Sequence, residues 1–427
     1  MKDERAGAIV VGGGLAGLSA ALGLARTGRA VTVFDPAADE RDPRTTAMLR
    51  PTIENLRAWG VWDRIEAETA PLRTMRIIDG SRRLVRAPTV TFDAAEIGEE
   101  AFGHNVPNAV ATGALRDALE ACDNASVVRL PVEHVALRDE VAEVQAGGAT
   151  HRAGLVVGAD GRGSLVRRAA NIAASERSYP QAALVTTFEH ELPHRNISTE
   201  FHAEHGPATQ VPLPGDRSSL VWMDRPDRIA RLSELDPSAL APEIEKRLDS
   251  LLGAVAIDGP VGTFPMSVMS AAAYSGRRAV LVGEAAHAFP PIGAQGFNLT
   301  MRDVADLVEL QRDAVDPGAR ALMEGYRRMR DRDAATRTLA VDALNRSLLS
   351  GLLPVQLAKA LGLAALKALP PLRQAIMREG LLARSTRVRS GSDAVQVLSG
   401  IAARGAEQLR RRRPGRRPGG VDPMRRA

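Results

Sequence analysis

Cysteine is almost absent from this sequence: the chain of 427 residues contains one, Cys122. A single cysteine excludes a disulfide framework and a thiolate metal cluster, and it suits a reducing compartment such as the cytosol. The eight histidines show no metal-ligand spacing, so we expect no metal site. Aromatic residues make up only 3% of the chain, which leaves few side chains for stacking on nucleic-acid bases. Apolar residues at 44% nevertheless allow a large core, so disorder of the whole chain is excluded.

Long apolar runs are also lacking. No uncharged apolar run reaches 18 residues, so no segment is expected to span a bilayer. The nearest approach, Leu348 to Leu369, is interrupted by a proline and two lysines. Residues 1–5 mix both charges, and the apolar run at 8–11 is too short for the core of an export signal. We therefore expect a cytoplasmic protein.

Positive charge is concentrated at the end of the chain. Residues 404–427 contain nine arginines and two acidic residues, a local net charge of +7, and they are rich in proline and glycine. Such a composition predicts a disordered tail. Subtracting this charge from the whole-chain value of +5 leaves −2 for residues 1–403. A basic face that binds nucleic acid is therefore not expected on the folded part.

The first motif joins two expected strands through a glycine-rich turn. Residues 8–11 are apolar and β-branched, the pattern of a buried parallel strand, and Gly-x-Gly-x-x-Gly follows before a helix at 18–25. A second strand at 30–34 ends in Asp35. The first glycine of such a motif makes a tight turn, the second lets a pyrophosphate approach the backbone, and the third lets the helix pack on the strand. The motif predicts a dinucleotide, FAD or NAD, bound by Gly12, Gly14, Ala16, Gly17 and Asp35.

Two later segments narrow the choice of dinucleotide from FAD or NAD to FAD. Residues 155–164 form an apolar strand that runs into an Asp160-Gly turn, and residues 278–287 form another that ends in Gly-Glu and leads into a proline- and glycine-rich loop. These motifs, in this order and spacing, resemble the aromatic-ring hydroxylases of the para-hydroxybenzoate hydroxylase type, which are single-component FAD monooxygenases. Residues 287–303 and 201–222 more narrowly resemble the branch that hydroxylates ubiquinone precursors. Short stretches of the C-terminal region, 345–348 and 378–381, resemble the same branch.

The resemblance implies FAD as the cofactor and assigns roles to several residues. Glu284, where the family usually has Asp, would hold the ribitol hydroxyls, Asp160 would touch the pyrophosphate side, and Arg44 would reach the AMP half. The loop and helix start at 293–299 would lie against the flavin pyrimidine ring, with Thr300 replacing a common glycine. The further cofactor-binding residues implied are Gly283, Gly293, Gly296, Phe297 and Asn298, and the candidate catalytic residues, which would line the flavin site, are His287, Pro290 and Pro291.

Each of these residues also has a purely structural interpretation. Glu284 could cap the following turn, and Asp160 could belong to an ordinary Asp-Gly turn. His287 could be a helix-entry histidine bonded to the backbone, and Arg44 could be solvated on a loop. The sequence does not choose between these alternatives.

The predicted fold class is α/β, a Rossmann-like FAD-binding domain with a β-sheet substrate domain and C-terminal helices. The FAD-binding domain must be discontinuous, because its motifs lie near residues 12, 160 and 283. Alternation at 181–191 and 199–202 predicts strands, and residues 210–213 and 218–223 flank a Pro-Gly-Asp turn typical of a hairpin. After residue 304 the pattern is helical to about residue 403. The predicted boundaries are 1–72, 99–178 and 264–345 for the FAD-binding domain, 73–98 and 179–263 for the substrate domain, 346–403 for the helical region and 404–427 for the disordered basic tail.

The resemblance implies a monooxygenase in which reduced FAD reacts with O2 to give a C4a-hydroperoxide, whose distal oxygen is attacked by an electron-rich phenol ring. Such chemistry needs exclusion of water and a well-held ring, but neither a metal nor a nucleophilic side chain. The implied substrate is a prenylated phenol of ubiquinone biosynthesis, and NAD(P)H or another reductant would supply electrons. The alternatives are a hydroxylase of another aromatic small molecule, a flavin-dependent reductase of prenyl chains, or a non-catalytic flavin-binding component of a quinone-biosynthesis assembly.

A ubiquinone precursor is too apolar to leave the bilayer, which predicts a peripheral contact with the inner face of the membrane. Apolar helices within 346–383 would give depth, and the basic tail would attract anionic lipid. The helices could instead pack on the FAD-binding domain, and the tail could instead bind acidic partner proteins or RNA.

Overall fold

The computed structural model describes residues 6–36, 42, 44–81, 86–291, 295–331 and 353–380. All of these residues belong to one compact unit. Gly293, residues 332–352 and 381–403, and the basic tail 404–427 lie outside the described residues, so the predictions made for them stay predictions.

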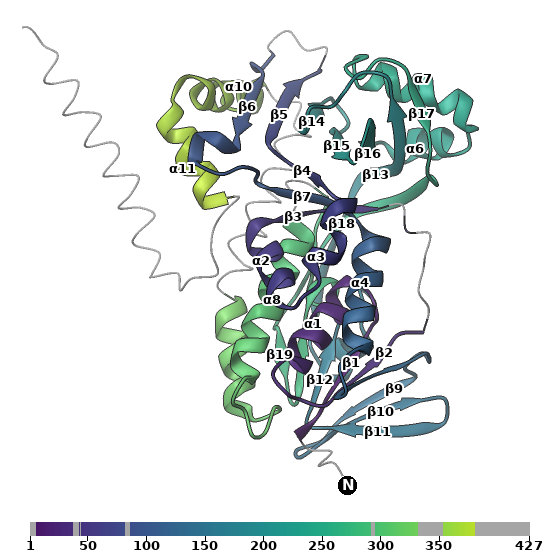
Figure 1. Cartoon of the computed structure of the whole chain (residues 1–427), viewed down its shortest axis with the longest axis vertical. Coiled ribbons are helices and arrows are strands. Elements are labelled where there is room, and N and C mark those ends of the chain that lie inside the picture. Colours follow the sequence, from purple (N-terminus) through teal and green to yellow (C-terminus); the bar gives the residue numbers. More distant parts are fainter. Residues whose placement is uncertain are drawn as a thin grey trace, which may run out of the picture. The chain divides into compact units, whose positions relative to one another are not determined.

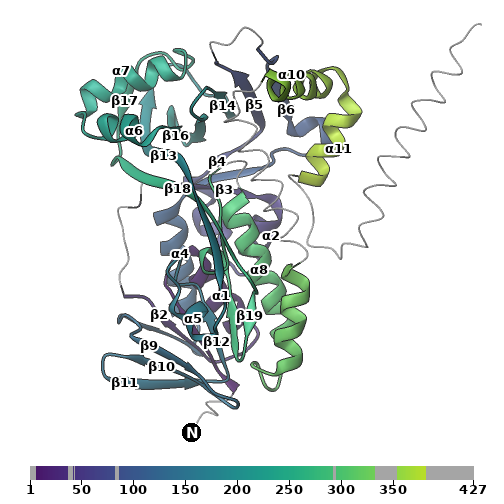
Figure 2. The same ribbon diagram turned by 180° about the vertical axis from the view of Figure 1, so that it is seen from behind.

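The first sheet has six strands in the order β19-β20-β12-β1-β2-β8, and four of its five pairings are parallel, the exception being β19 with β20. The strands predicted at 8–11, 30–34 and 155–158 are confirmed, and all but one of their residues in β1, β2 and β12 are buried. Helix α1 packs against both α4 and α8 beside this sheet (Figures 1 and 2). The bounds are β1 Ala8–Val11, β2 Val31–Phe34, β8 Ala125–Val128, β12 Leu155–Gly158, β19 Ser275–Gly276, β20 Ala279–Leu281, α1 Leu15–Ala25, α4 Asn108–Glu120 and α8 Gln295–Gln311.

The second sheet is larger and mostly antiparallel, in the order β21-β18-β13-β16-β15-β14-β5-β6, with β17 paired to β13. The hairpin predicted around the Pro-Gly-Asp turn is confirmed, since β15 and β16 pair in antiparallel register. Strands β13 and β18 extend beyond the predicted boundaries at 179 and 263, so the division into domains stays a prediction. The bounds are β5 Thr74–Asp79, β6 Val90–Asp93, β13 Ala174–His190, β14 Ile197–His202, β15 Ala208–Leu213, β16 Arg217–Asp224, β17 Val255–Ile257, β18 Gly262–Ala271 and β21 His287–Ala288.

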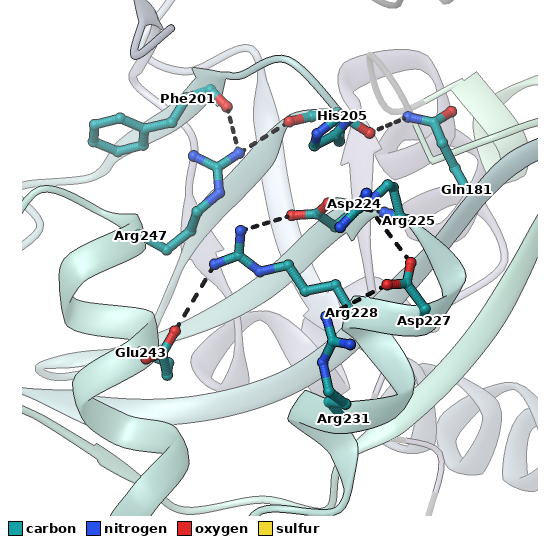
Figure 3. Close-up of polar contacts among 11 residues, drawn as sticks. Gln181, Phe201, His205, Asp224, Arg225, Asp227, Arg228, Arg231, Glu243 and Arg247 are labelled. Carbon is teal, nitrogen blue, oxygen red and sulfur yellow. Dashed lines mark hydrogen bonds and ion pairs between the residues drawn. The ribbon is translucent and has the colours of Figure 1, made fainter. Parts of the chain in front are cut away.

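One face of the second sheet, called here the outer face, is covered by α6 (Pro226–Ser233) and α7 (Pro237–Arg247). Trp222 of β16 is fully buried on this face, with the guanidinium carbons of Arg228 and Arg247 5.3 and 5.7 Å from its ring centroid. Figure 3 shows Arg228 pairing with both Asp224 and Glu243. Arg247 has no carboxylate partner among the drawn residues and donates to backbone carbonyls, and burial lowers the pKa of its guanidinium to about 10.

The opposite face, called here the inner face, contacts a small third sheet in the order β3-β7-β4. The Thr45 hydroxyl of β3 lies 2.9 Å from that of Ser219 on β16. Asn105 of β7 donates to the Pro212 carbonyl oxygen at 2.9 Å. The third sheet therefore joins the second sheet to the elements that follow β3. The bounds are β3 Thr45–Leu49, β4 Ala70–Pro71 and β7 Gly103–Pro107.

The helices after residue 295 confirm part of the predicted helical region. Residues 320–331 are helical, as are α10 (Leu353–Ala368) and α11 (Pro370–Gly380), but residues 312–319 are not. A turn interrupts the helix there because Asp316 accepts from the Gly318 N–H at 3.1 Å and pairs with Arg278. The remaining elements are α2 Arg50–Ala58, α3 Trp62–Ile65, α5 Leu165–Ala169, β9 His134–Leu137, β10 Ala142–Ala146 and β11 Ala149–Ala153, together with the 3-10 turns η2 Glu66–Glu68, η3 Ala94–Ile97 and η4 Gly283–Ala285.

Candidate functional site

The glycine turn between β1 and α1 is tight at two positions and open at a third. Gly12 has φ +114°, and a Cβ there or at Gly17 would collide with backbone, the Ala159 carbonyl in one case and the Gly12 carbonyl in the other. At Gly14 an added Cβ would meet nothing within 4 Å. Gly14 is also the N-cap of α1, and no side chain caps that end. The helix therefore presents a free N-terminus with open space before it, which is suited to an anion such as a diphosphate.

The Asp35 carboxylate lies directly behind this turn. Its side chain is only 3% exposed, and it presses against Gly13, where a Cβ would overlap it. Two arginines donate to the same oxygen, Oδ2: Arg116 of α4 at 3.0 Å and Arg129 at 2.6 Å. Neither arginine was predicted from the sequence to lie at this site. Arg129 could have been found, because it directly follows β8, the strand that pairs with β2 in parallel and so ends beside it.

The second motif, the strand and Asp160 turn at residues 155–164, contacts the first motif, the glycine-rich turn at residues 12–17. The carbonyl of Ala159 is the atom that a Cβ at Gly12 would strike, so the two turns are in contact. The Asp160 carboxylate accepts from the Leu165 N–H at 2.6 Å and the Ser164 hydroxyl at 2.5 Å, and thereby caps α5. The side chain of Asp160 thus has a structural task as a helix cap, which differs from the ordinary Asp-Gly turn considered from the sequence, and its cofactor contact stays a prediction.

The third motif, the strand and Gly283-Glu284 turn at residues 278–287, contacts both of the other motifs. Gly283 has φ +60°, and a Cβ there would be 3.0 Å from that of Ala16 in α1. Glu284, about half exposed, has a carboxylate oxygen 3.4 Å from Nε of Arg162, next to the Asp160 turn. Three segments separated by more than 100 residues in the sequence therefore meet at one place. Glu284 keeps an accessible carboxylate there, as a group that accepts hydrogen bonds from hydroxyls would need.

The start of α8 lies beside the same place. Gly296 is exposed with no atom within 4 Å of an added Cβ, and the Thr300 hydroxyl donates to its carbonyl at 3.1 Å. A Cβ at Gly283 would come 3.2 Å from that hydroxyl, so Thr300 fills the space between α8 and the third motif. Phe297 packs partly buried against the core of the first sheet.

Asn298 has an evident structural task. Its Oδ1 accepts from the Leu49 N–H at 2.9 Å and from the Thr52 hydroxyl at 2.7 Å, and its Nδ2 donates to the Ala47 carbonyl at 2.7 Å. These bonds fix β3 and the start of α2 against α8. The cofactor contact expected for Asn298 stays a prediction.

His287 is held inside the protein. Its Nε2 is 2.6 Å from Oδ2 of Asp303, its side chain is 1% exposed, and its ring stacks on Phe289 at a centroid distance of 5.4 Å. Asp303 also accepts from the Gly283 N–H at 3.1 Å and pairs with Arg330 at 2.8 Å. Asp303, to which no role was assigned from the sequence, therefore holds the third motif in place through Gly283 and His287. Of the two predicted lining prolines, Pro290 is buried and Pro291 is exposed.

Arg44 pairs with a neighbouring carboxylate. Its Nε and Nη2 each lie 2.7 Å from an oxygen of Asp42, and its guanidinium lies 5.4 Å from the ring centroid of Phe264. Burial would raise the pKa of Asp42, but hydrogen bonds from Arg44 and Asn108 hold it below its usual range. Arg44 thus stands at the junction of β3 and the second sheet, and its contact with the AMP half of FAD stays a prediction.

These features fit FAD. The open, uncapped N-terminus of α1 would take the diphosphate, Asp35 lies at the end of the neighbouring strand, and Glu284 is exposed at the meeting of the three motifs. Within the described ranges there is no group of three or more His, Cys, Asp or Glu side chains that could hold a metal ion.

The chain is similar to known FAD-binding proteins in both sequence and fold. The FAD binding domain family matches residues 5–339. The chain is 35% identical to the ubiquinone hydroxylase UbiL of Rhodospirillum rubrum over 392 aligned residues. The aligned region covers 89% of this chain and 90% of that protein. It is 33% identical over 371 residues to the 3-demethoxyubiquinol 3-hydroxylase of Escherichia coli, covering 83% and 93%. The structure of p-nitrophenol 4-monooxygenase PnpA from Pseudomonas putida superposes with a TM-score of 0.74 at 19% identity, covering 89% and 99%, a likeness of fold.

Proposed function

Because the chain belongs to the FAD binding domain family, we propose that it is an FAD-dependent monooxygenase that hydroxylates the aromatic ring of a prenylated phenol in ubiquinone biosynthesis. The observation that carries the proposal is the meeting of the three motifs at Gly12–Ala159, Ala16–Gly283 and Arg162–Glu284, in a chain that is similar over nearly its whole length to ubiquinone hydroxylases.

The protein's own residues supply binding and positioning. Bound FAD, once reduced, supplies the activation of O2 for transfer of one oxygen atom to the ring. The N-terminus of α1 holds the diphosphate through its N–H groups, and Glu284 accepts hydrogen bonds from the ribitol chain. Asn298 fixes β3 next to the start of α8, so that the ring of the substrate has a rigid wall on this side.

The inner face of the second sheet provides the opposite wall. Thr209, Val211 and Val221 lie on this face, as the register of β15 and β16 requires, and all three are only partly buried. Val211 is the register partner of Ser219, and Val221 and its own register partner Thr209 lie two positions further along the strands. Ser219 in turn lies 2.9 Å from the Thr45 hydroxyl of β3. A mostly apolar surface of this kind suits a prenylated ring, because it excludes water from the reacting atoms.

Isotope labelling tests this function. FAD-loaded protein, NAD(P)H as the proposed reductant and a prenylated phenol should consume O2 and yield a ring-hydroxylated product. With 18O2 the label should appear in the new hydroxyl, and with labelled water it should not. Label that arrives from water, or reductant oxidation with only peroxide as product, would exclude this monooxygenase function. Removal of FAD should abolish the reaction.

We also propose a peripheral contact with the inner face of the membrane, because a prenylated phenol resides in the bilayer. Among the described helices none is both long and apolar enough to cross a membrane. On α10 and its junction with α11, however, Leu361 is 69% exposed and Leu369 is 52% exposed, and Ile376 of α11 is 46% exposed. Lys367 and Arg378 lie on the same two helices. Exposed apolar residues beside basic ones suit an anionic lipid surface.

Liposome flotation distinguishes this proposal from a chain that stays in solution. The protein should float with anionic vesicles at low salt and less at high salt, and a chain ending at residue 403 should float less while its FAD content is unchanged. Leu361→Ser together with Ile376→Ser should also weaken flotation. Failure of the full-length protein to float with anionic vesicles would refute the membrane contact. Equal flotation by all of these chains would refute the role of the tail and of Leu361 and Ile376, and either outcome would leave the hydroxylase proposal standing.

A further inference from the structure

Glu200 and His202 form an isolated pair on the inner face of the second sheet. Glu200 of β14 pairs in register with Thr209, which pairs with Val221, so the three side chains are lateral neighbours on the face that also carries Ser219. His202 lies two residues further along β14, on the same face. From Ser219, Glu200 is two strands across and two positions along, about 12 Å by ordinary strand spacings. The pair therefore shares the wall proposed for the substrate.

The pair is incompletely bonded for its degree of burial. Nε2 of His202 lies 2.6 Å from Oε1 of Glu200, and the two side chains are 7% and 20% exposed. The other ring nitrogen, Nδ1, is buried with no hydrogen-bond partner within the described ranges. The imidazole thus holds one oxygen of the carboxylate, and the carboxylate is the more accessible of the two groups.

A second histidine in the same sheet shows what a purely structural arrangement looks like here. On the outer face, Nδ1 of His190 lies 3.0 Å from the Leu192 carbonyl oxygen, and its Nε2 lies 3.0 Å from the Ser218 hydroxyl. The Ser218 hydroxyl also accepts from Gln210 at 2.8 Å. Both ring nitrogens of His190 are therefore satisfied inside the protein. The Glu200 carboxylate, in contrast, accepts from His202 alone among the described residues and has a second oxygen available.

The surroundings of Glu200 limit what it can bind. Its register neighbours are Ile77, Thr209 and, one strand further, Val221, none of them ionisable. Among the described residues in register with the pair on β14, the charged one is Asp79, the partner of His202, whose oxygens accept from the Ser81 and Ala87 N–H groups. A carboxylate in such a place favours a neutral hydrogen-bond donor and repels an anion.

We propose that Glu200 accepts a hydrogen bond from the ring hydroxyl of the substrate and that His202 positions the carboxylate for it. The inference rests on the proposed function, and it adds the group that recognises the phenol. A carboxylate that accepts this hydrogen bond shifts electron density from the hydroxyl into the ring, which favours attack of the ring on oxygen. It also orients the ring, since the hydroxyl marks one edge of it.

Equilibrium binding to FAD-loaded protein tests the inference without turnover. The probes are a prenylated phenol and the methyl ether of the same phenol, which lacks the donor. Wild-type protein should prefer the phenol by about tenfold or more, the range expected for a hydrogen bond to a charged acceptor. Glu200→Leu should bring the ratio of the two dissociation constants close to one, with the ether bound as before. Glu200→Gln, which keeps a neutral acceptor and the shape of the side chain, should give an intermediate ratio.

His202 is tested by a conservative pair of variants. Gln can place an amide N–H where the imidazole Nε2–H was, so His202→Gln should retain most of the preference, whereas His202→Leu should lose it. His190→Gln is the matched control: it is expected to change the stability of the sheet but not the phenol-to-ether ratio. FAD content is measured for every variant by absorbance.

The outcomes separate the inference from the function on which it rests. A preference for the phenol that persists in Glu200→Leu and Glu200→Gln overturns the role of Glu200 and leaves the hydroxylase intact. Loss of the preference in His190→Gln as well would show a general effect of the sheet, and would overturn it too. If the wild type binds neither probe, the proposed substrate class is wrong and the inference falls with it.

Discussion

Gly14 offers a substitution that separates cofactor binding from folding. An added Cβ there meets nothing within 4 Å, and the residue has an extended backbone, φ −80° and ψ −176°, that valine adopts readily. In the protein without cofactor, Gly14→Val should therefore cost only about 1 kcal/mol, the difference between glycine and a β-branched residue at an N-cap. The two methyl groups, however, would occupy the space in front of the α1 N-terminus that a diphosphate needs.

The expected loss of affinity is large. A ligand that must retreat from the helix N-terminus loses several hydrogen bonds to backbone N–H groups, each worth roughly 1.5 kcal/mol or more with a charged acceptor. Two such bonds correspond to about a hundredfold increase in the dissociation constant of FAD. The measurement is a titration of apoprotein with FAD, followed by quenching of flavin fluorescence, beside thermal unfolding of the same apoprotein.

Gly17→Ala is the matched control, because a Cβ at Gly17 would collide with the carbonyl of Gly12 and must distort the turn itself. It should lower the stability of the apoprotein by more than Gly14→Val does. The reasoning is refuted if Gly14→Val binds FAD as tightly as the wild type, or if it unfolds the apoprotein as severely as Gly17→Ala.

Three further predictions concern two residues of the site and one ion pair elsewhere in the fold. Glu284→Gln should weaken FAD binding about tenfold, because an amide is a poorer acceptor for hydroxyls than a carboxylate. Glu284→Asp should be tolerated. Equal FAD affinities of Glu284→Gln and the wild type in the same fluorescence titration would contradict the role of the exposed carboxylate. Asp303→Asn should cost about 3 kcal/mol in denaturant unfolding, the lower end of the range for a broken buried ion pair, because His287 loses its carboxylate partner while Arg330 keeps Asp306 at 2.9 Å. A loss below about 1 kcal/mol would show that Asp303 does not hold the third motif in place. The hydrogen bond from Arg278 holds the pKa of Asp316 below its usual range, so the pair stabilises the fold above the unfolded pKa near 4 and loses this effect as pH falls through the folded value. Unfolding curves of Arg278→Met should accordingly differ more from the wild type at pH 6 than at pH 3, and a pH-independent difference would argue against the ion pair.

Local patterns in the sequence were sufficient for the elements that carry the motifs. Apolar β-branched runs bounded by glycines predict β1, β2 and β12, and alternation around a Pro-Gly-Asp turn predicts the β15–β16 hairpin. The family resemblance then indicated that the segments around Gly12, Asp160 and Gly283 belong to one site. These are properties of a few consecutive residues, and no tertiary information is needed to read them.

What the sequence could not indicate are the contacts between distant segments. Arg116 reaches Asp35 from a helix 81 positions away, and Asp303 reaches Gly283 only because α8 packs beside the third motif. The structural task of Asn298 likewise depends on β3, which lies about 250 residues earlier. The interruption at 312–319 escaped the sequence analysis, because helical periodicity on both sides concealed a short turn closed by Asp316.

The long-range construction of the first sheet has a consequence for biosynthesis. Ala8 pairs with Leu155, and Val156 in turn pairs with Ala279, so neighbouring strands are separated by 147 and 123 residues of chain. Ala16 and Gly283, which meet at the proposed cofactor site, are 267 residues apart. At roughly 5–20 residues per second, a ribosome needs roughly 15 to 50 s between synthesising one and the other. During this interval β1 and the glycine turn have left the ribosome without the third motif, so the nascent chain is expected to acquire FAD only after β20 and η4 emerge.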